Sequence, residues 1–223
     1  VVLLFVCFPG AYAAISTALH IPITAMLVGV ILRGTAFTFR AYDTGPGRDA
    51  RSQGWSRTFA ITSTITPVML GVIAGAVAAG GVTFDAQGKV ATDFISAWWT
   101  PFPFVIGLLT LALFAQIAAV YLCVVHAGHA LADDFRWRAL AAGGAVVILA
   151  WTAWIVAETG APGLRERLMA GGGGLIVHGV TTLAGIVTFV ALWRRRYQVA
   201  RVAVMAQTTG VLLGQAWGQA PYL

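Results

Sequence analysis

Long apolar runs separated by short polar segments make up almost the whole chain. The first run covers residues 1–39, where His20 and Arg33 are the only histidine and the only charged residue. It is too long for one membrane crossing, since a helix spans the bilayer core with about 20 residues. Proline is tolerated in the first turn of a helix and disfavours helix in the residue before it. A break at Pro22 therefore predicts two helices, residues 1–19 and 22–40.

Five further apolar runs follow, over residues 55–80, 98–125, 137–156, 175–193 and 199–222. The segments between them include residues 42–48, 84–89 and 160–163, whose glycine, proline and aspartate content is typical of turns. The four glycines 171–174 indicate a flexible lead into the next run. The pattern predicts about seven crossings, and so an all-α polytopic transmembrane helix bundle. We expect residues 1–223 to be a single integral membrane domain, cut at both ends from a longer chain.

Composition agrees with this pattern and excludes a water-soluble domain. Hydrophobic residues make up 59% of the chain, charged residues only 10%, and the mean hydropathy is +0.83, whereas soluble domains carry roughly 25% charged residues. Cys7 and Cys123 lie in separate apolar runs and form no CxxC pair. The cysteines therefore give no basis for a zinc site or a disulfide framework.

The net charge of +6 carries information through its distribution. Basic residues concentrate in short cytoplasmic loops of membrane proteins. Lys89, Arg165 and Arg167 are the only basic residues on one side when connections are assigned to alternate sides. The other eleven lie in or near the connections after the second, fourth and sixth spans: Arg33, Arg40, Arg48, Arg51, Arg57, Arg136, Arg138, Arg194, Arg195, Arg196 and Arg201. We therefore expect the connections after those three spans to be cytoplasmic.

Two arginines lie within or at the end of the second predicted span. Arg33 and Arg40 are seven residues apart, which places them on nearly the same helix face. An arginine at the centre of a membrane helix costs about 2.5–3.5 kcal/mol on insertion scales. Both side chains could reach the cytoplasmic interface, or Arg33 could face a protein partner or an anionic group. Gly34 beside it would let another helix approach closely.

The third predicted span contains hydroxyl residues before a proline and a stripe of small residues. The hydroxyls in residues 62–66 are placed to satisfy backbone groups that Pro67 frees. Pro67, Gly71, Gly75 and Ala79 then recur at every fourth position. Small residues at this spacing favour close helix packing.

The ionisable residues give little sign of catalysis. Among the four histidines, only His126 and His129 share one depth, so we expect no metal or haem ligation by this chain. A dihaem b-type cytochrome using His126 and His178 would need both at one depth, although the predicted topology puts them at opposite membrane faces. No carboxylate lies inside a predicted span, which disfavours a proton-coupled transporter because such proteins usually bury one.

Two segments resemble a known family. Phe8-Pro-Gly-Ala-Tyr-Ala13 and Ile31-Leu-Arg-Gly-Thr-Ala-Phe-Thr-Phe-Arg40 are similar to segments of subunit II of cytochrome bd-type quinol oxidases, including the cyanide-insensitive branch. Weaker matches run through nearly the whole chain, among them Trp55, Pro67 with Gly71, and Gln219 with Pro221. Thr38 departs from the family, which usually has an acidic residue there.

The resemblance implies a haem-poor subunit that stabilises a haem-bearing partner. In this family the partner, subunit I, holds b- and d-type haems and the principal quinol site. Subunit II is expected to help protons or oxygen reach those haems, in the bacterial inner membrane. Whether ubiquinone contacts this chain stays open, as does the proton route, given Thr38. A small-solute transporter or channel is the alternative function.

The residues expected to serve subunit contact or structure follow from this resemblance and from the packing pattern. Arg33 and Arg40 would position the cytoplasmic end of the second span against subunit I. The full set is Arg33, Gly34, Phe37, Arg40, Trp55, Pro67, Gly71, Gly75, Gln219 and Pro221.

Overall fold

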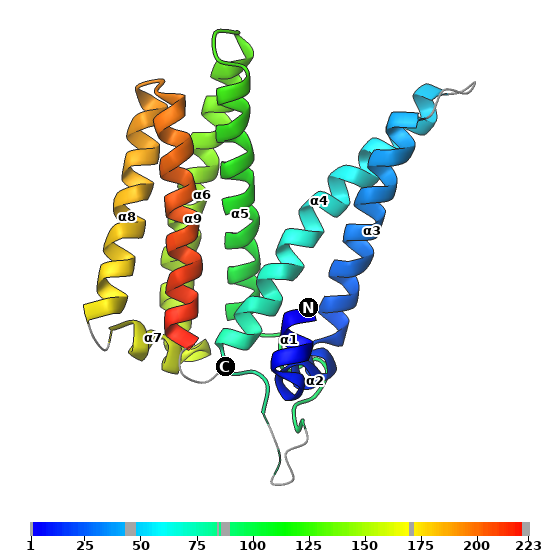
Figure 1. Cartoon of the computed structure of the whole chain (residues 1–223), viewed down its shortest axis with the longest axis vertical. Coiled ribbons are helices and arrows are strands. Elements are labelled where there is room, and N and C mark those ends of the chain that lie inside the picture. The colour runs from blue at the N-terminus through cyan, green and yellow to red at the C-terminus, as the bar shows by residue number, and fades with distance from the viewer. Residues whose placement is uncertain (1, 43–47, 84, 86–89, 170–171, 220–223) are drawn as a thin grey trace. The chain divides into compact units, whose positions relative to one another are not determined.

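The computed structural model describes residues 2–42, 48–83, 85, 90–169 and 172–219. In these residues the long regular elements are all α-helices (Figure 1). They are α1 (Val2–Cys7), α2 (Pro9–Ala18), α3 (His20–Tyr42), α4 (Arg48–Ala78), α5 (Pro101–Val125), α6 (Leu131–Gly160), α7 (Pro162–Met169), α8 (Gly172–Trp193) and α9 (Tyr197–Gln219). The expected all-α class is confirmed.

The N-terminal run differs from the prediction of one helix over residues 1–19. It forms two short helices, α1 and α2, which meet at Phe8 with φ −136° and ψ 63°. Pro9 occupies the first turn of α2. Its ring excludes helical geometry at the preceding residue and removes a backbone donor, so the helix stops and restarts there. The break that Pro22 was expected to make lies instead at Leu19, and α3 begins at His20.

Five helices of the described residues are long and apolar enough to cross a membrane: His20–Tyr42, Ser52–Ala78, Pro101–Val125, Leu131–Gly160 and Gly172–Trp193. The 23-residue helix α9 is as long as α3 but contains more polar side chains. The expected number of about seven crossings is roughly consistent with these helices. The first predicted span accounts for one missing crossing, because neither α1 nor α2 is long enough alone at 1.5 Å per residue.

Two segments expected to be loops are helical. Residues 160–163 were predicted as a turn, but Pro162 begins the eight-residue helix α7, as proline often does in a first turn. Gly172–Gly174 belong to α8 rather than to a flexible lead. A Cβ atom at Gly174 would collide with the Leu168 backbone. Glycine is therefore needed here for a close approach between α7 and α8.

Residue contacts divide the chain into two compact units. Unit 1 contains Val1–Val77 and Gly81–Gly107, and unit 2 contains Ala78–Gly80 and Leu108–Leu223. In unit 1, α3 and α4 lie side by side (Figure 1). Its core joins Leu19 at the end of α2, Val72 and Ala76 of α4, and Trp98 before α5. That the chain is a single membrane domain stays a prediction.

Unit 2 is a bundle of α5, α6, α8 and α9 (Figure 1). Helix α7 lies beside the C-terminal ends of α6 and α9. Its core contains Val120 and Cys123 of α5, Leu140 of α6, Leu192 of α8 and Val204 of α9. These residues lie near the ends of α5 and α8 and the beginnings of α6 and α9. The bundle is therefore closed by packed side chains at this end, which the α8–α9 turn covers.

Candidate functional site

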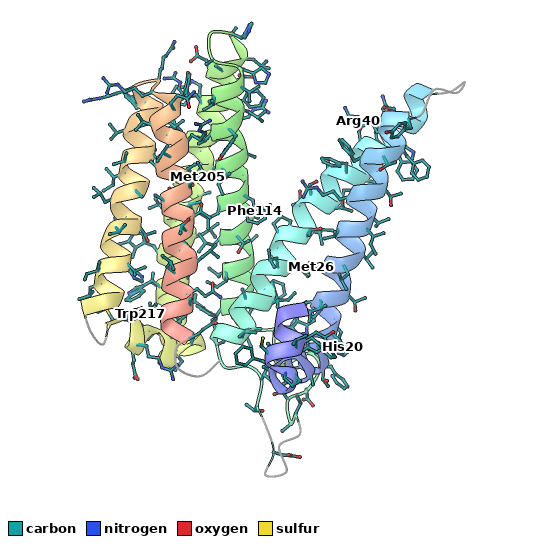
Figure 2. All side chains as sticks on the ribbon, viewed as in Figure 1. His20, Met26, Arg40, Phe114, Met205 and Trp217 are labelled. Carbon is teal, nitrogen blue, oxygen red and sulfur yellow. The ribbon has the colours of Figure 1, made fainter. Side chains whose placement is uncertain are left out.

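The candidate site from sequence centres on α3. Its buried residues are Pro22, Gly29 and Ala36, so most of the helix surface is exposed in this chain. Phe37 is 67% exposed and Ile31 64% exposed. Figure 2 labels His20 and Arg40 at opposite ends of the helix. An apolar helix face with so few partners within the chain is suited to lipid or to another membrane subunit.

Aromatic side chains of α4 hold the arginine-bearing half of α3. The Arg33 guanidinium carbon lies 5.5 Å from the centre of the Phe59 ring, a cation–π contact. One turn and a half further on, Phe39 stacks on Trp55 with ring centres 5.0 Å apart. Trp55 was expected among the structural residues, whereas Phe59 was missed. Nothing in the sequence pattern distinguishes Phe59 from the other aromatic residues of the apolar runs.

The close approach between α3 and α4 occurs at Gly29 rather than at Gly34. A Cβ at Gly29 would collide with the Thr66 hydroxyl, while one at Gly34 would meet nothing within 4 Å. The two glycines are five residues apart and therefore face different directions on the helix. Within this chain, Gly34 does not serve close helix contact, and any such role concerns a surface outside the chain.

The small-residue stripe of α4 packs on α5 near Gly75. A Cβ on Gly75 would lie 2.8 Å from the Pro103 Cα and 3.1 Å from the Ile106 Cβ. Conversely, a Cβ on Gly107 would lie 2.8 Å from the Val68 carbonyl oxygen. Gly71 is also buried. Glycines on both helices thus bring the α4 and α5 backbones together.

The hydroxyls before Pro67 are arranged differently from the expectation. Pro67 lies inside α4 and frees the Ser63 carbonyl. Thr62 donates to the Thr58 carbonyl at 2.8 Å, and Thr64 donates to the Ala60 carbonyl at 3.0 Å, so neither serves the freed group. The Ser63 and Thr66 hydroxyls are buried without a hydrogen-bond partner. The expectation is therefore wrong, because none of these hydroxyls donates to the carbonyl that Pro67 frees.

Three positions of the family resemblance remain: Thr38, Gln219 and Pro221. The Thr38 hydroxyl donates to the Gly34 carbonyl at 3.0 Å, so it is satisfied by its own helix. Gln219 is the last residue of α9. Pro221 lies outside the described residues.

Charged side chains gather at the end of unit 2 where α6 and α9 begin. Asp133 near the start of α6 contacts Arg136 at 3.4 Å and Arg195 in the α8–α9 turn at 3.2 Å. Arg195 adopts the left-handed conformation, with φ 57°, which is costly for a side chain other than glycine. The ion pair therefore ties the turn to α6. The sequence pattern shows these arginines but not their carboxylate partner.

His126 and His178 lie at opposite ends of the unit 2 bundle. His126 follows α5, at the end of unit 2 where α6 begins (Figure 1). His178 lies near the start of α8, at the opposite end of the bundle. Their Nδ1 atoms donate to the Leu122 and Gly174 carbonyls, at 3.0 and 3.1 Å. Two axial ligands of one haem must lie on either side of the iron, which these two residues cannot do from opposite ends of a bundle.

Two buried glutamines in unit 2 were missed by the sequence analysis. Gln116 of α5 is 3% exposed and Gln207 of α9 is 7% exposed. The Oε1 atom of each is buried and has no hydrogen-bond partner. Both side chains line a partly open cavity of about 450 Å³ between the helices of unit 2. The available signal for Gln116 was a lone amide in the middle of an apolar run, whereas Gln207 shares its run with Gln215 and Gln219.

These features define a class of protein. The long apolar helices and the glycine-mediated helix contacts are those of a multi-pass helical membrane protein. A search of curated proteins found no significant match. The family model of cytochrome bd terminal oxidase subunit II matches residues 1–223. The chain therefore belongs to the cytochrome bd terminal oxidase subunit II family.

One solved structure supports the same fold. The bd oxidase from Geobacillus thermodenitrificans contains a chain that is 20% identical, with a TM-score of 0.79. The match covers 97% of this chain and 64% of that chain. This chain thus spans less than two thirds of the length of the matched chain.

Proposed function

We propose that this chain is the haem-poor subunit II of a quinol:oxygen oxidoreductase of the cytochrome bd type. The observation that carries the proposal is the family match over residues 1–223. In the proposed complex, a haem-bearing subunit I holds the b- and d-type haems and oxidises quinol. This chain performs no chemistry alone; it stabilises subunit I and contributes to the access of protons and oxygen in aerobic respiration.

The α3 surface is the part of the chain proposed to contact subunit I. Phe37 and Arg40 are exposed beside Arg33, which has a cation–π contact with Phe59 and no ion pair among the described residues. A guanidinium in a membrane helix is costly without an anionic partner. A carboxylate of subunit I or a lipid phosphate would supply that partner, and the neighbouring apolar side chains would supply contact area.

We propose the bacterial cytoplasmic membrane as the location, with the basic connections inside. In unit 2, Arg136 and Arg138 at the start of α6 and Arg194 to Arg196 after α8 lie at one end of the bundle (Figure 1). Arg165 and Arg167 of α7 lie at the other end. The larger basic group favours the cytoplasmic side.

The transporter alternative has no such support. Both the family model and the solved structure are those of a bd oxidase or its subunit. The exposed apolar residues beside Arg33 on α3 also favour a subunit role.

Replacing Arg33 tests the proposal. Arg33→Leu should lower the haem per copy of this chain in isolated membranes by roughly tenfold or more, because it leaves a buried anion of the partner unpaired. The measurement is the visible spectrum of d-type haem in complexes purified through this chain.

Two further variants serve as controls. Arg33→Lys keeps the charge and should retain most of the complex, while Arg57→Leu removes an exposed arginine of α4 and should leave assembly unchanged. Normal haem spectra with normal oxidase activity in Arg33→Leu would contradict the interface role. A wild-type chain that purifies alone and colourless from its native membrane would contradict the oxidase role.

A further inference from the structure

The cavity inside unit 2 has the size of a ligand site. It lies between α5, α6, α8 and α9 and has a volume of about 450 Å³, within the range of roughly 300–1,000 Å³ of small-molecule pockets. Glycines on the facing helices make room for the two glutamine side chains of its wall. Gly143 of α6 lies across from Gln116, with 3.1 Å from a built Cβ to Nε2, and Gly185 of α8 lies across from Gln207, at 3.6 Å from the amide carbon.

The two glutamines need a hydrogen-bond donor. Gln116 is nine residues from the end of α5, and Gln207 is ten residues from the start of α9, so each is about 13–15 Å from the nearest helix end. At such depth in a membrane, an unpaired carbonyl costs several kcal/mol. Two of them on the wall of one cavity indicate that an occupant donates to them.

The remaining wall selects a neutral, largely apolar occupant. Apart from the two glutamines, Thr181 and Thr182, the described residues of the wall are apolar or glycine, and none is charged. The Thr181 hydroxyl already donates to the Val177 carbonyl. An ionised head group would lose its hydration without gaining a counter-ion. Water alone would satisfy the amides but would leave the apolar wall wetted.

Access to the cavity is from the side of the bundle. The packed core around Val120 and Leu192 closes one end. Trp151 of α6 and Ile186 of α8 line the cavity and are 66% and 55% exposed. Helix α8 makes most of its contacts with α9 and far fewer with α6. A molecule dissolved in the bilayer can therefore enter between α6 and α8.

We propose that this cavity binds a neutral lipid-soluble amphiphile whose hydroxyl-bearing head group donates to Gln116 and Gln207, with its apolar chain leaving between α6 and α8. Acylglycerols and quinols both have this chemistry. The proposal does not rest on the oxidase role of the chain, because it depends only on the geometry of unit 2.

Photolabelling of the intact complex tests the site. The probe is a monoacylglycerol with a diazirine in its acyl chain, applied to the complex in lipid nanodiscs. Saturable labelling is expected on residues 147–151 and 186–189, read by mass spectrometry. The double variant Gln116→Leu/Gln207→Leu should lower this labelling roughly tenfold, since two hydrogen bonds are lost. Gln198→Leu, an exposed position on α9, should not lower it.

Further arms identify the source of the ligand and keep the test independent of folding. Unlabelled monoacylglycerol and decylubiquinol are added as competitors to the wild-type complex, and the stronger competitor identifies the class that fills the site. A probe with its hydroxyls methylated should label the two stretches roughly tenfold less. Absence of saturable labelling there, no competition by either compound, or equal labelling by the methylated probe would each overturn the proposal.

Discussion

Glycines determine how closely the helices of unit 1 approach each other. Gly29 faces Thr66, and Gly75 faces the Pro103 backbone, where even one added carbon would lie closer than van der Waals contact allows. Gly54 on the same helix as Gly75 has no neighbour within 4 Å of a built Cβ. Packing in α4 therefore requires glycine at position 75 but not at position 54.

Gly75→Ala should lower the free energy of unfolding by about 1–3 kcal/mol, the usual cost of overpacking a filled contact. Gly54→Ala should leave stability unchanged or raise it by up to about 1 kcal/mol, since alanine is the better helix former. The apparent melting temperature of the purified complex compares the two. Equal melting temperatures for both variants would show that α4 and α5 can separate without cost.

Gln116 and Gln207 could be found only by combining sequence with structure. Gln116 is the only amide in its apolar run, and Gln207 shares its run with Gln215 and Gln219. By sequence alone, either residue is as consistent with a helix contact as with a ligand site. The burial of both amides on the wall of one cavity removes that ambiguity.

At the scale of elements, an ion pair and an aromatic contact join α7 to α6. Arg165 contacts Glu158 of α6 at 2.8 Å, and its guanidinium carbon lies 5.3 Å from the Trp154 ring centre. His178 of α8 contacts the same Trp154 ring, at 5.8 Å between centres. One tryptophan thus links three helices at the α7 end of the bundle.

Glu158→Gln should loosen α7. The ion pair is partly exposed, so its loss is expected to raise amide exchange in residues 162–169 by roughly twofold to fivefold. Hydrogen–deuterium exchange of the purified complex measures this change. Glu166→Gln, on the exposed face of α7, serves as the matched control. Faster exchange in both variants would mean that net charge, not this contact, stabilises α7.

Apolar runs predict some helices of this chain well and miss others. The runs predict α5, α8 and α9 to within a few residues, because apolar length is the dominant requirement for a membrane helix. They merge α1 with α2, since hydropathy does not register the backbone constraint at Pro9. They also miss α7, whose charged sequence has no apolar run.

At the scale of the whole molecule, charge asymmetry predicts orientation. In unit 2, five arginines lie near the C-terminal end of α8 and the start of α6. Arg165 and Arg167 lie on α7, at the opposite end of the bundle. Asp133 offsets part of the larger group through its contacts with Arg136 and Arg195. The imbalance that remains is still strong enough to favour one orientation.

Cysteine accessibility tests this orientation. In a Cys7→Ser background, cysteine replacing Arg167 should react with a membrane-impermeant maleimide in spheroplasts. Cysteine replacing Arg138 should react only after the membrane is opened. Cys123 is fully buried and should stay unreactive in both. Labelling of the Arg138 position in intact spheroplasts would reverse the proposed topology.

The sequence by itself determined the helical membrane class, the family resemblance and the positions of most long helices. These depend on properties that are local along the chain: apolar length, turn residues, charge placement and short motifs. The family match over residues 1–223 confirms the resemblance first indicated by residues 8–13 and 31–40.

Only the tertiary structure decided which small residues make contact and where polar groups meet. The direction of a glycine or an amide depends on the rotation of its helix and on the neighbour it faces, which a pattern in one helix does not specify. Gly29 rather than Gly34 therefore lies at the contact with α4, and Gln116 and Gln207, 91 positions apart, share one cavity.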